Sequence, residues 1–201
     1  MLKKDFKNIN KMKIPKLSPS QLQMTWQCAA QCDALITSED WLRSFWYEQY
    51  WSDGIAMAKY DNGAGDHVIA LFSVDGKVVL KGFDHESEVS PYARDEYGIW
   101  PGIYEGMPQE FLRLIQDEAI ESELVTFCCW STDGKSWETG TALLPVGIDD
   151  GSDWLLDMVQ MDAEEFIEWA KSYYEDNFER IGEDGIFKEF NVRYKPASLG
   201  D

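Results

Sequence analysis

The chain has 201 residues, of which 37 are acidic and 18 basic, and its formal net charge is −19. This length fits one domain with a sizeable core, and the 44% hydrophobic and 14% aromatic fractions are too high for a disordered chain. A surface this negative repels phosphate backbones and attracts cations. The composition therefore argues against nucleic-acid binding and favours a basic partner protein, or else the charge serves only solubility.

The charge is unevenly distributed along the chain. Residues 1–16 hold six lysines and one aspartate, so this arm carries +5 and the remaining residues carry −24. We expect residues 1–17 to form a flexible basic tail and residues 18–201 to form a single domain. No stretch is apolar over the length that a bilayer needs, and the N-terminus lacks the apolar core of a signal peptide. The expected location is the cytoplasm, without a membrane partner.

The first half of the domain changes from a helical to an alternating pattern. A cap at Ser18 predicts a helix through Ile36, and a second cap at Thr37 or Ser38 predicts another short helix. The apolar stripe of that second helix consists of Trp41, Leu42, Phe45 and Trp46. Strand-like runs follow at residues 54–60, 68–72 and 78–83, joined by turn residues such as Asp75-Gly76. Residues 54–83 are therefore expected to form an antiparallel meander.

The second half begins with a loop-rich passage over residues 84–104. The elements expected after it are a helix over residues 107–119, strands at 124–130 and 139–144, a helix from a cap at Asp162 to near Phe178, and a closing strand at 186–194. Together these elements predict an α+β fold: an antiparallel sheet of about five or six strands with helices packed on it. The loops that connect such strands lie at the two ends of the sheet, and functional sites are common in such loops.

The cysteines and the sequence motifs indicate no cofactor and no metal. Cys28 and Cys32 lie four residues apart, and Cys128 and Cys129 are adjacent, so neither pair forms a C-x-x-C motif or a zinc knuckle. We expect all four to be core thiols in a reducing compartment, with Cys128 and Cys129 on opposite faces of a strand. The sequence also lacks the G-x-S-x-G, P-loop, G-x-G-x-x-G, H-E-x-x-H and EF-hand patterns.

The best candidate for a chemically active group is His85, which Asp84 and Glu86 flank at the end of a predicted strand. Histidine changes charge near neutral pH, and neighbouring acids raise its pKa. Ser87 and Ser90 follow in the same loop. Two interpretations stay open: the acids cap backbone amides of a purely architectural turn, or the segment binds a ligand or carries out catalysis.

Aromatic residues of the long loop are candidate contacts for a partner protein. Tyr92 and Trp100 both lie in this loop, and exposed tyrosine and tryptophan side chains are frequent anchors in protein interfaces. The alternative for Trp100 is a lid that packs on the core. Most of the other tryptophans lie on apolar stripes or strands, and we expect the following to be core residues: Trp26, Trp41, Trp46, Trp51, Trp130 and Trp169.

Several segments between residues 65 and 180 together resemble a family of uncharacterised bacterial proteins. The most specific segment is Lys81-Gly82-Phe83-Asp84-His85-Glu86-Ser87. The others are Ser90-Pro91-Tyr92, Trp100-Pro101-Gly102, Asp153-Trp154-Leu155 and Tyr173-Tyr174-Glu175. The resemblance implies a bacterial protein but no assigned activity. In its acidity, its tryptophan content and its lack of catalytic motifs, the chain is also similar to immunity proteins of bacterial toxin systems.

The sequence favours binding over catalysis. We expect an acidic, immunity-like protein-binding module that binds or neutralises a basic, toxin-like partner protein, without nucleic acid. The alternative is a hydrolase or ligand-binding protein whose site surrounds Asp84, His85 and Glu86.

Overall fold

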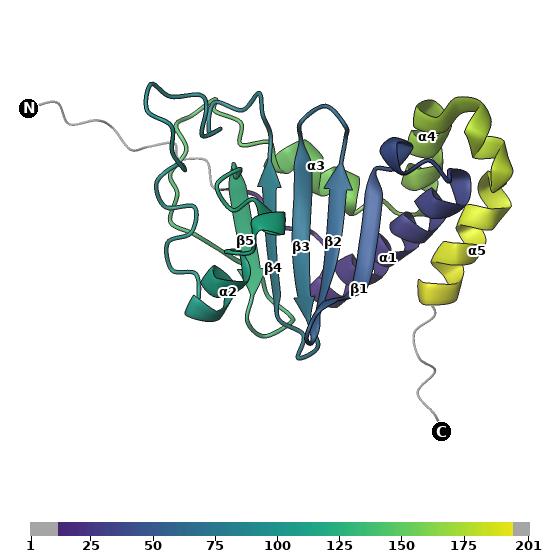
Figure 1. The fold of residues 1–201 in the computed structure, drawn as a ribbon, viewed down its shortest axis with the longest axis horizontal. Coiled ribbons are helices and arrows are strands. Elements are labelled where there is room, and N and C mark those ends of the chain that lie inside the picture. The colour runs from purple at the N-terminus through teal and green to yellow at the C-terminus, as the bar shows by residue number, and fades with distance from the viewer. Residues whose placement is uncertain (1–11, 195–201) are drawn as a thin grey trace, which may run out of the picture.

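The computed structural model describes residues 12–194, which form a six-stranded antiparallel sheet with helices packed on it (Figure 1). The strands pair in chain order: β1 (Phe45–Ser52), β2 (Ile55–Asp61), β3 (His67–Ser73), β4 (Val78–Phe83), β5 (Phe127–Ser131) and β6 (Glu138–Thr139). The helices are α1 (Pro19–Ile36), α2 (Gln109–Leu114), α3 (Ser152–Val159), α4 (Ala163–Tyr174) and α5 (Gly182–Tyr194). The predicted α+β class and the predicted strand number are confirmed.

One face of the sheet packs against helices at both ends of the chain. Phe45 of β1 meets Phe166 and Trp169 of α4, and Trp26 of α1 meets Phe72 of β3 edge to face. Aromatic rings bury large apolar areas, so these contacts form the centre of the core. We call this the helix-covered face.

The opposite face is covered only in part. Over β4 and β5 it lies beneath the segment 84–126, which includes α2, whereas the side chains of Trp46, Met57 and Lys59 on β1 and β2 are half-buried (Figure 1). We call this the front face. Because both faces are covered at β5, the adjacent residues Cys128 and Cys129 are both buried, and all four cysteines are free, as expected of core thiols.

The second predicted helix is wrong. Asp40–Leu42 makes only one turn of 3-10 helix, and β1 begins at Phe45. The Asp33 carboxylate accepts hydrogen bonds from the backbone N–H groups of Ser44 and Phe45, at 2.8 and 2.6 Å, and thereby directs the chain into the strand. Trp41, expected in the core, is 77% exposed.

The predicted closing strand is also wrong, because residues 182–194 form α5. Ile186 and Phe190 are four residues apart, which places them on one side of a helix, and both are buried. The alternation of the sequence is compatible with a strand, but packing against α1 and α4 selects the helix. Local pattern alone does not distinguish these two periods over so few apolar residues.

Two other predicted elements are shorter than expected. The helix expected over residues 107–119 is divided into α2 and a 3-10 turn at Glu118–Ile120. The strand expected over 139–144 ends at Thr139, because Gly140 lies against the backbone of Gly102 and Ile103 and draws the chain away from β5. A Cβ at Gly140 would lie 2.0 Å from the Gly102 carbonyl oxygen, so only glycine fits there.

Part of the expected N-terminal tail lies against the domain. Leu17 N–H donates to Gln160 Oε1 at 3.0 Å, Trp137 Nε1–H donates to the Leu17 carbonyl at 2.8 Å, and Met12 is buried. Residues 1–11 of the expected tail are outside the described residues. Among residues 12–194, no helix combines the length and the apolar character that crossing a membrane requires.

Candidate functional site

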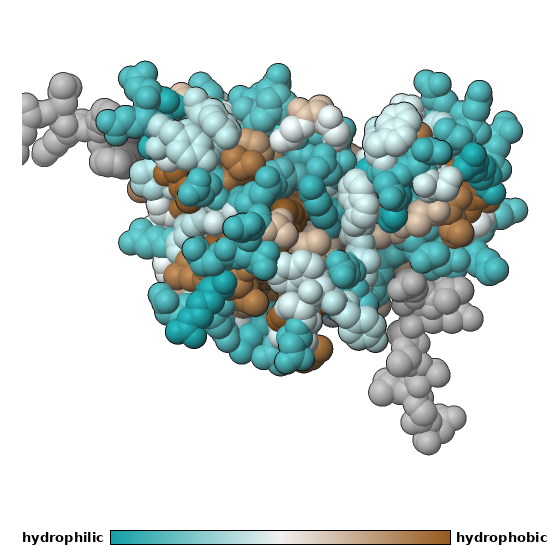
Figure 2. Space-filling view, viewed as in Figure 1, coloured by the Kyte–Doolittle hydropathy of each residue, from teal (hydrophilic) through white to brown (hydrophobic). Residues whose placement is uncertain are grey.

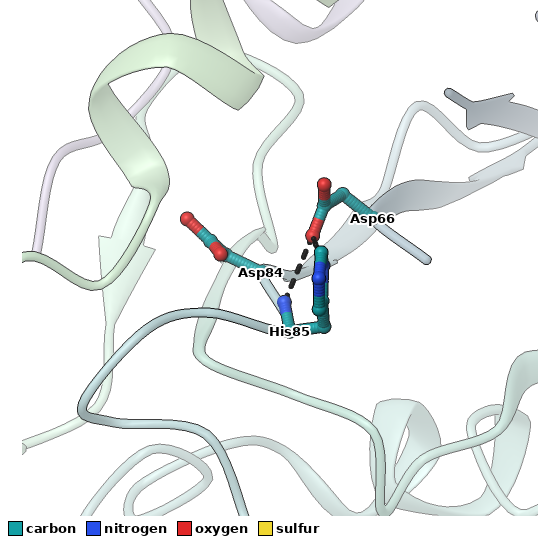
Figure 3. Close-up of side chains that lie close together, drawn as sticks. All are labelled: Asp66, Asp84 and His85. Atoms are coloured by element: carbon teal, nitrogen blue, oxygen red, sulfur yellow. Dashed lines mark hydrogen bonds and ion pairs between the residues drawn. The ribbon is translucent and has the colours of Figure 1, made fainter. Parts of the chain in front are cut away.

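The pairing of β3 with β4 brings His85 beside an aspartate that is distant in sequence. His67 pairs with Phe83, so the residue before β3 and the residues after β4 meet at one end of the hairpin. Asp66 Oδ1 accepts hydrogen bonds from His85 N–H at 2.8 Å and lies 2.7 Å from His85 Nδ1 (Figure 3). The imidazole is therefore oriented by Asp66 rather than by its neighbours in sequence, and its side chain is 44% exposed.

The other carboxylate oxygens at this site already hold donors. Asp66 Oδ2 accepts from Asn62 Nδ2 at 2.7 Å. Asp84 Oδ1 accepts from the Glu86 backbone N–H at 3.0 Å, and Asp84 Oδ2 accepts from Trp154 Nε1 at 3.0 Å. Asp66, Asp84 and His85 each offer one potential metal ligand atom within 4.8 Å of the others. Each of these carboxylate oxygens therefore accepts at least one hydrogen bond from the chain, and these bonds brace the loop.

His85 and Asp66 each stabilise the charged form of the other. The hydrogen bond that the His85 ring donates to the Asp66 carboxylate raises the pKa of His85 above its ordinary value. Burial alone would raise the pKa of Asp66, but hydrogen bonds from the backbone and ring of His85 and from Asn62 outweigh it and lower that pKa. The stabilisation from Asp66 is lost as the pH falls through its lowered pKa, and that from His85 is lost as the pH rises through its raised pKa.

Replacing Asp66 with alanine is expected to lower the free energy of unfolding by about 2 kcal/mol, because the donors of His85 and Asn62 lose their acceptor. The change His85→Ala should lower it less, since the backbone N–H of residue 85 keeps its bond to Asp66. Urea denaturation of both variants measures the difference. Equal losses would show that the imidazole, rather than the backbone contact, holds the loop.

The two serines of the predicted site are buried in the loop. Ser87 Oγ–H donates to the Asp149 carbonyl at 2.7 Å, and Ser90 is 1% exposed. Glu86 points into solvent, with 85% of its side chain exposed. The segment after β4 therefore packs onto residues 149–154, and it does not gather its polar groups around one reacting atom.

Tyr92 and Trp100 belong to a separate feature at the surface. Tyr92 and Tyr97 are 65% and 52% exposed, and their ring centroids are 5.1 Å apart. Trp100 is half-buried, and the guanidinium of Arg94 lies over its ring at 5.7 Å. A hollow of about 540 Å³ adjoins Trp100 and is lined by Arg94, Trp100, Pro101, Gly102, Glu105, Thr141 and Leu143. We call Tyr92, Tyr97, Trp100 and Leu143 the aromatic patch.

The sequence did not reveal a buried basic pair beneath the segment 84–126. Lys81 is 1% exposed, and its Nζ lies 3.0 Å from His67 Nε2, 2.8 Å from the Glu121 carbonyl and 2.7 Å from the Leu124 carbonyl. Burial lowers the pKa of Lys81 to about 7, and burial together with the Lys81 charge lowers the pKa of His67 to about 3. The signal for this pair is a lysine inside the strand run Val78-Val79-Leu80-Lys81-Gly82-Phe83.

Comparison of the chain with protein-family models, with curated proteins and with solved structures finds no match. The resemblance to uncharacterised bacterial proteins and to immunity proteins therefore stays a prediction. The assignment of function depends on the geometry described above.

Proposed function

We propose that the chain is an acidic protein-binding module that, like immunity proteins, binds a basic partner protein through the aromatic patch. The observation that carries this proposal is a cluster of exposed tyrosines beside a hollow on a molecule of net charge −19. Residues of this kind supply most of the binding energy in protein interfaces, since they bury much area with few rotatable bonds.

Several acidic side chains lie at the aromatic patch, beside one cation, Arg94, over the Trp100 ring. Asp95 and Glu96 lie between its two tyrosines in sequence, and Glu105 lines its hollow; all three are exposed. Tyr97 Oη–H also donates to Glu123 at 3.3 Å, which places another carboxylate at the patch. A rim in which acids outnumber bases steers a basic partner and fixes its orientation, while the aromatic centre supplies affinity.

The test begins with capture and identification of a partner from the cells that make this protein, at low salt, and continues with purified components. Replacing Tyr92 and Tyr97 with alanine together should weaken binding by at least about tenfold, mainly through faster dissociation. The charge reversals Asp95→Lys and Glu96→Lys should slow association and reduce its dependence on salt. Surface plasmon resonance at several salt concentrations separates the two rates.

The matched control reverses two exposed acids at the opposite end of the molecule. Asp176 and Glu179 lie after α4, far from the segment 84–105 (Figure 1). Their reversal changes the net charge equally, so it should leave most of the association rate intact. The proposal is wrong if the partner is acidic, or if the control pair and the patch pair have the same effect.

The hydrolase alternative has one supporting observation, the His85–Asp66 pair, because an aspartate that orients a histidine is part of many general-base arrangements. Such an arrangement also needs a nucleophile or a bound water within reach of the imidazole. The hydroxyls of Ser87 and Ser90 are buried, and that of Ser87 is bonded to the Asp149 carbonyl. The geometry therefore supports a braced loop and a binding protein better than a hydrolase.

A further inference from the structure

The uncovered half of the front face contains a second hollow, distinct from the aromatic patch. Its volume is about 330 Å³, and it is lined by Arg43, Trp46, Tyr47, Glu48, Met57 and Lys59. Trp46 pairs with Lys59, and Glu48 with Met57, so these four residues stand on alternate rungs of β1 and β2 and share one face of the sheet. Figure 2 shows this face, where pale and tan side chains lie among the teal charged ones.

Arg43 at the rim of this hollow lacks a close counter-ion, although the chain has 37 acidic residues. Its one ion pair among the described residues reaches Asp40 at 3.9 Å, beyond hydrogen-bond distance, and the Asp40 side chain is 90% exposed. Arg43 Nη2 donates to the Phe45 carbonyl at 3.1 Å, and its Nε is buried without a hydrogen-bond partner among residues 12–194. Because Nε is buried, an anion in the hollow would bind the outer guanidinium nitrogens, of which Nη1 has only the distant Asp40 as a partner among residues 12–194.

The two cationic groups gather at the Trp46 end of the hollow, and Met57 lies at the other end. The guanidinium of Arg43 lies over the Trp46 ring at 5.6 Å. Lys59 pairs with Trp46 across the strands, and its ammonium forms an ion pair with Asp61 at 2.9 Å that leaves N–H donors for another acceptor. Met57 stands two rungs further along, beside Glu48. An anionic group is therefore attracted to the Arg43 end, and an apolar body attached to it would lie against Trp46 and Met57.

We infer that this hollow binds a small organic acid: a carboxylate held by Arg43 and Lys59, attached to an aromatic or aliphatic body that packs on Trp46 and Met57. The volume lies at the lower end of the range for small-molecule sites. Charge complementarity favours this occupant, because two cationic side chains, Arg43 and Lys59, line one end of the hollow, while the one acid of the lining, Glu48, stands beside Met57. A second copy of the chain, also at −19, would be repelled.

The inference is tested by titrating the full-length, ¹⁵N-labelled protein with 4-phenylbutyrate and with its neutral counterpart 4-phenylbutan-1-ol. The acid is expected to shift the Trp46 Nε1–H and Arg43 Nε–H resonances saturably below 5 mM, and the alcohol is expected to bind at least about tenfold more weakly. Arg43→Gln and Lys59→Gln should each weaken binding of the acid. If Arg43→Gln disturbs the fold at the start of β1, the binding measured with Lys59→Gln alone still tests the inference.

The matched control is Arg113→Gln on α2, an exposed arginine outside both hollows, which should leave binding unchanged. Equal affinity for the acid and the alcohol overturns the inference, as does the absence of saturable shifts at 5 mM. Binding of acetyl-Gly-Gly-Phe with a free carboxylate, but not of 4-phenylbutyrate, also overturns it, because the occupant would then be the end of a polypeptide chain.

Discussion

Replacing Asp33 with alanine is expected to lower the free energy of unfolding by about 3–5 kcal/mol. Asp33 is 0% exposed and lies where α1, β1 and α4 meet. Its Oδ2 accepts from Ser44 N–H and Phe45 N–H, and its Oδ1 accepts from the Tyr174 hydroxyl. The alanine variant leaves the two buried N–H donors at the start of β1 without an acceptor, and the Tyr174 hydroxyl keeps only the Leu42 carbonyl, 3.3 Å away. Urea denaturation followed by tryptophan fluorescence measures the loss.

The same carboxylate should give stability a recognisable dependence on pH. Burial raises the pKa of Asp33 from 3.8 to about 6, against the hydrogen bonds from Phe45 and Ser44. Between these two pH values the unfolded chain releases the proton and the folded chain keeps it, so this group makes stability fall as the pH rises through the window. The fall is on the order of 3 kcal/mol, at 1.36 kcal/mol per pKa unit.

The matched control for Asp33 is Asp33→Asn, which keeps an oxygen for the two backbone donors. Its amide can donate to the Tyr174 oxygen while the Tyr174 hydroxyl turns to the Leu42 carbonyl, 3.3 Å away. This variant should lose much less stability than the alanine variant, and the fall between pH 4 and 6 should disappear. If stability still falls between pH 4 and 6 in the asparagine variant, the pH dependence arises from another titratable group.

Replacing Lys81 with methionine is expected to lower the free energy of unfolding by about 3 kcal/mol, although methionine fits the apolar surroundings. The loss arises because the carbonyls of Glu121 and Leu124 are left without the donor that joins their turn to β4. That turn in turn holds Tyr104, whose hydroxyl donates to the Ser122 carbonyl at 2.7 Å. Amide hydrogen exchange should therefore rise in residues 115–126 before it rises in β1 and β2.

The pH dependence of Lys81 has the opposite sign to that of Asp33. Because burial lowers the pKa of Lys81 to about 7, the folded chain releases this proton above pH 7 while the unfolded chain keeps it up to about pH 10.5. Stability from this group therefore rises with pH across that window. Neutral Lys81 can keep all three contacts, since its two N–H groups reach the carbonyls and its lone pair accepts from His67 Nε2–H.

The control for Lys81 is Lys188→Met, which removes an exposed lysine from α5. This change should alter the free energy of unfolding by no more than about 0.5 kcal/mol. The difference in stability between the native chain and Lys81→Met should grow between pH 7 and 10. A constant difference would mean that Lys81 stays charged inside the protein throughout this range.

Local signals were sufficient where one short segment determines the structure. The Asp75-Gly76 turn needs a positive φ, which Gly76 provides at 87°, and the predicted meander is confirmed over β2, β3 and β4. The predicted cap at Asp162 is likewise confirmed as a capping box with Glu165. Residues 37–46 and 186–194 were assigned wrongly, because a carboxylate on α1 and the packing of α5 on α1 decide their structure.

The candidate site was predictable only in part for the same reason. The position of His85 at the exit of β4 follows from the strand pattern, whereas its partner Asp66 depends on the register of β3 against β4. That register places residue 66 beside residue 84. It follows from the Asp75-Gly76 turn, because residues at equal distances before and after the turn pair with each other. The buried position of Lys81 depends on a covering segment about forty residues later in the chain.

The sheet order has a consequence for how the protein forms during synthesis. Each strand pairs with its neighbour in sequence, so β1 to β4 need only short loops to close and can associate as soon as they leave the ribosome. Helix α1 emerges before them, yet one of its main partners is α5, the last helix described. The nascent chain therefore carries an incompletely covered apolar surface on α1 until α5 has been synthesised, and a chaperone is most useful during that interval.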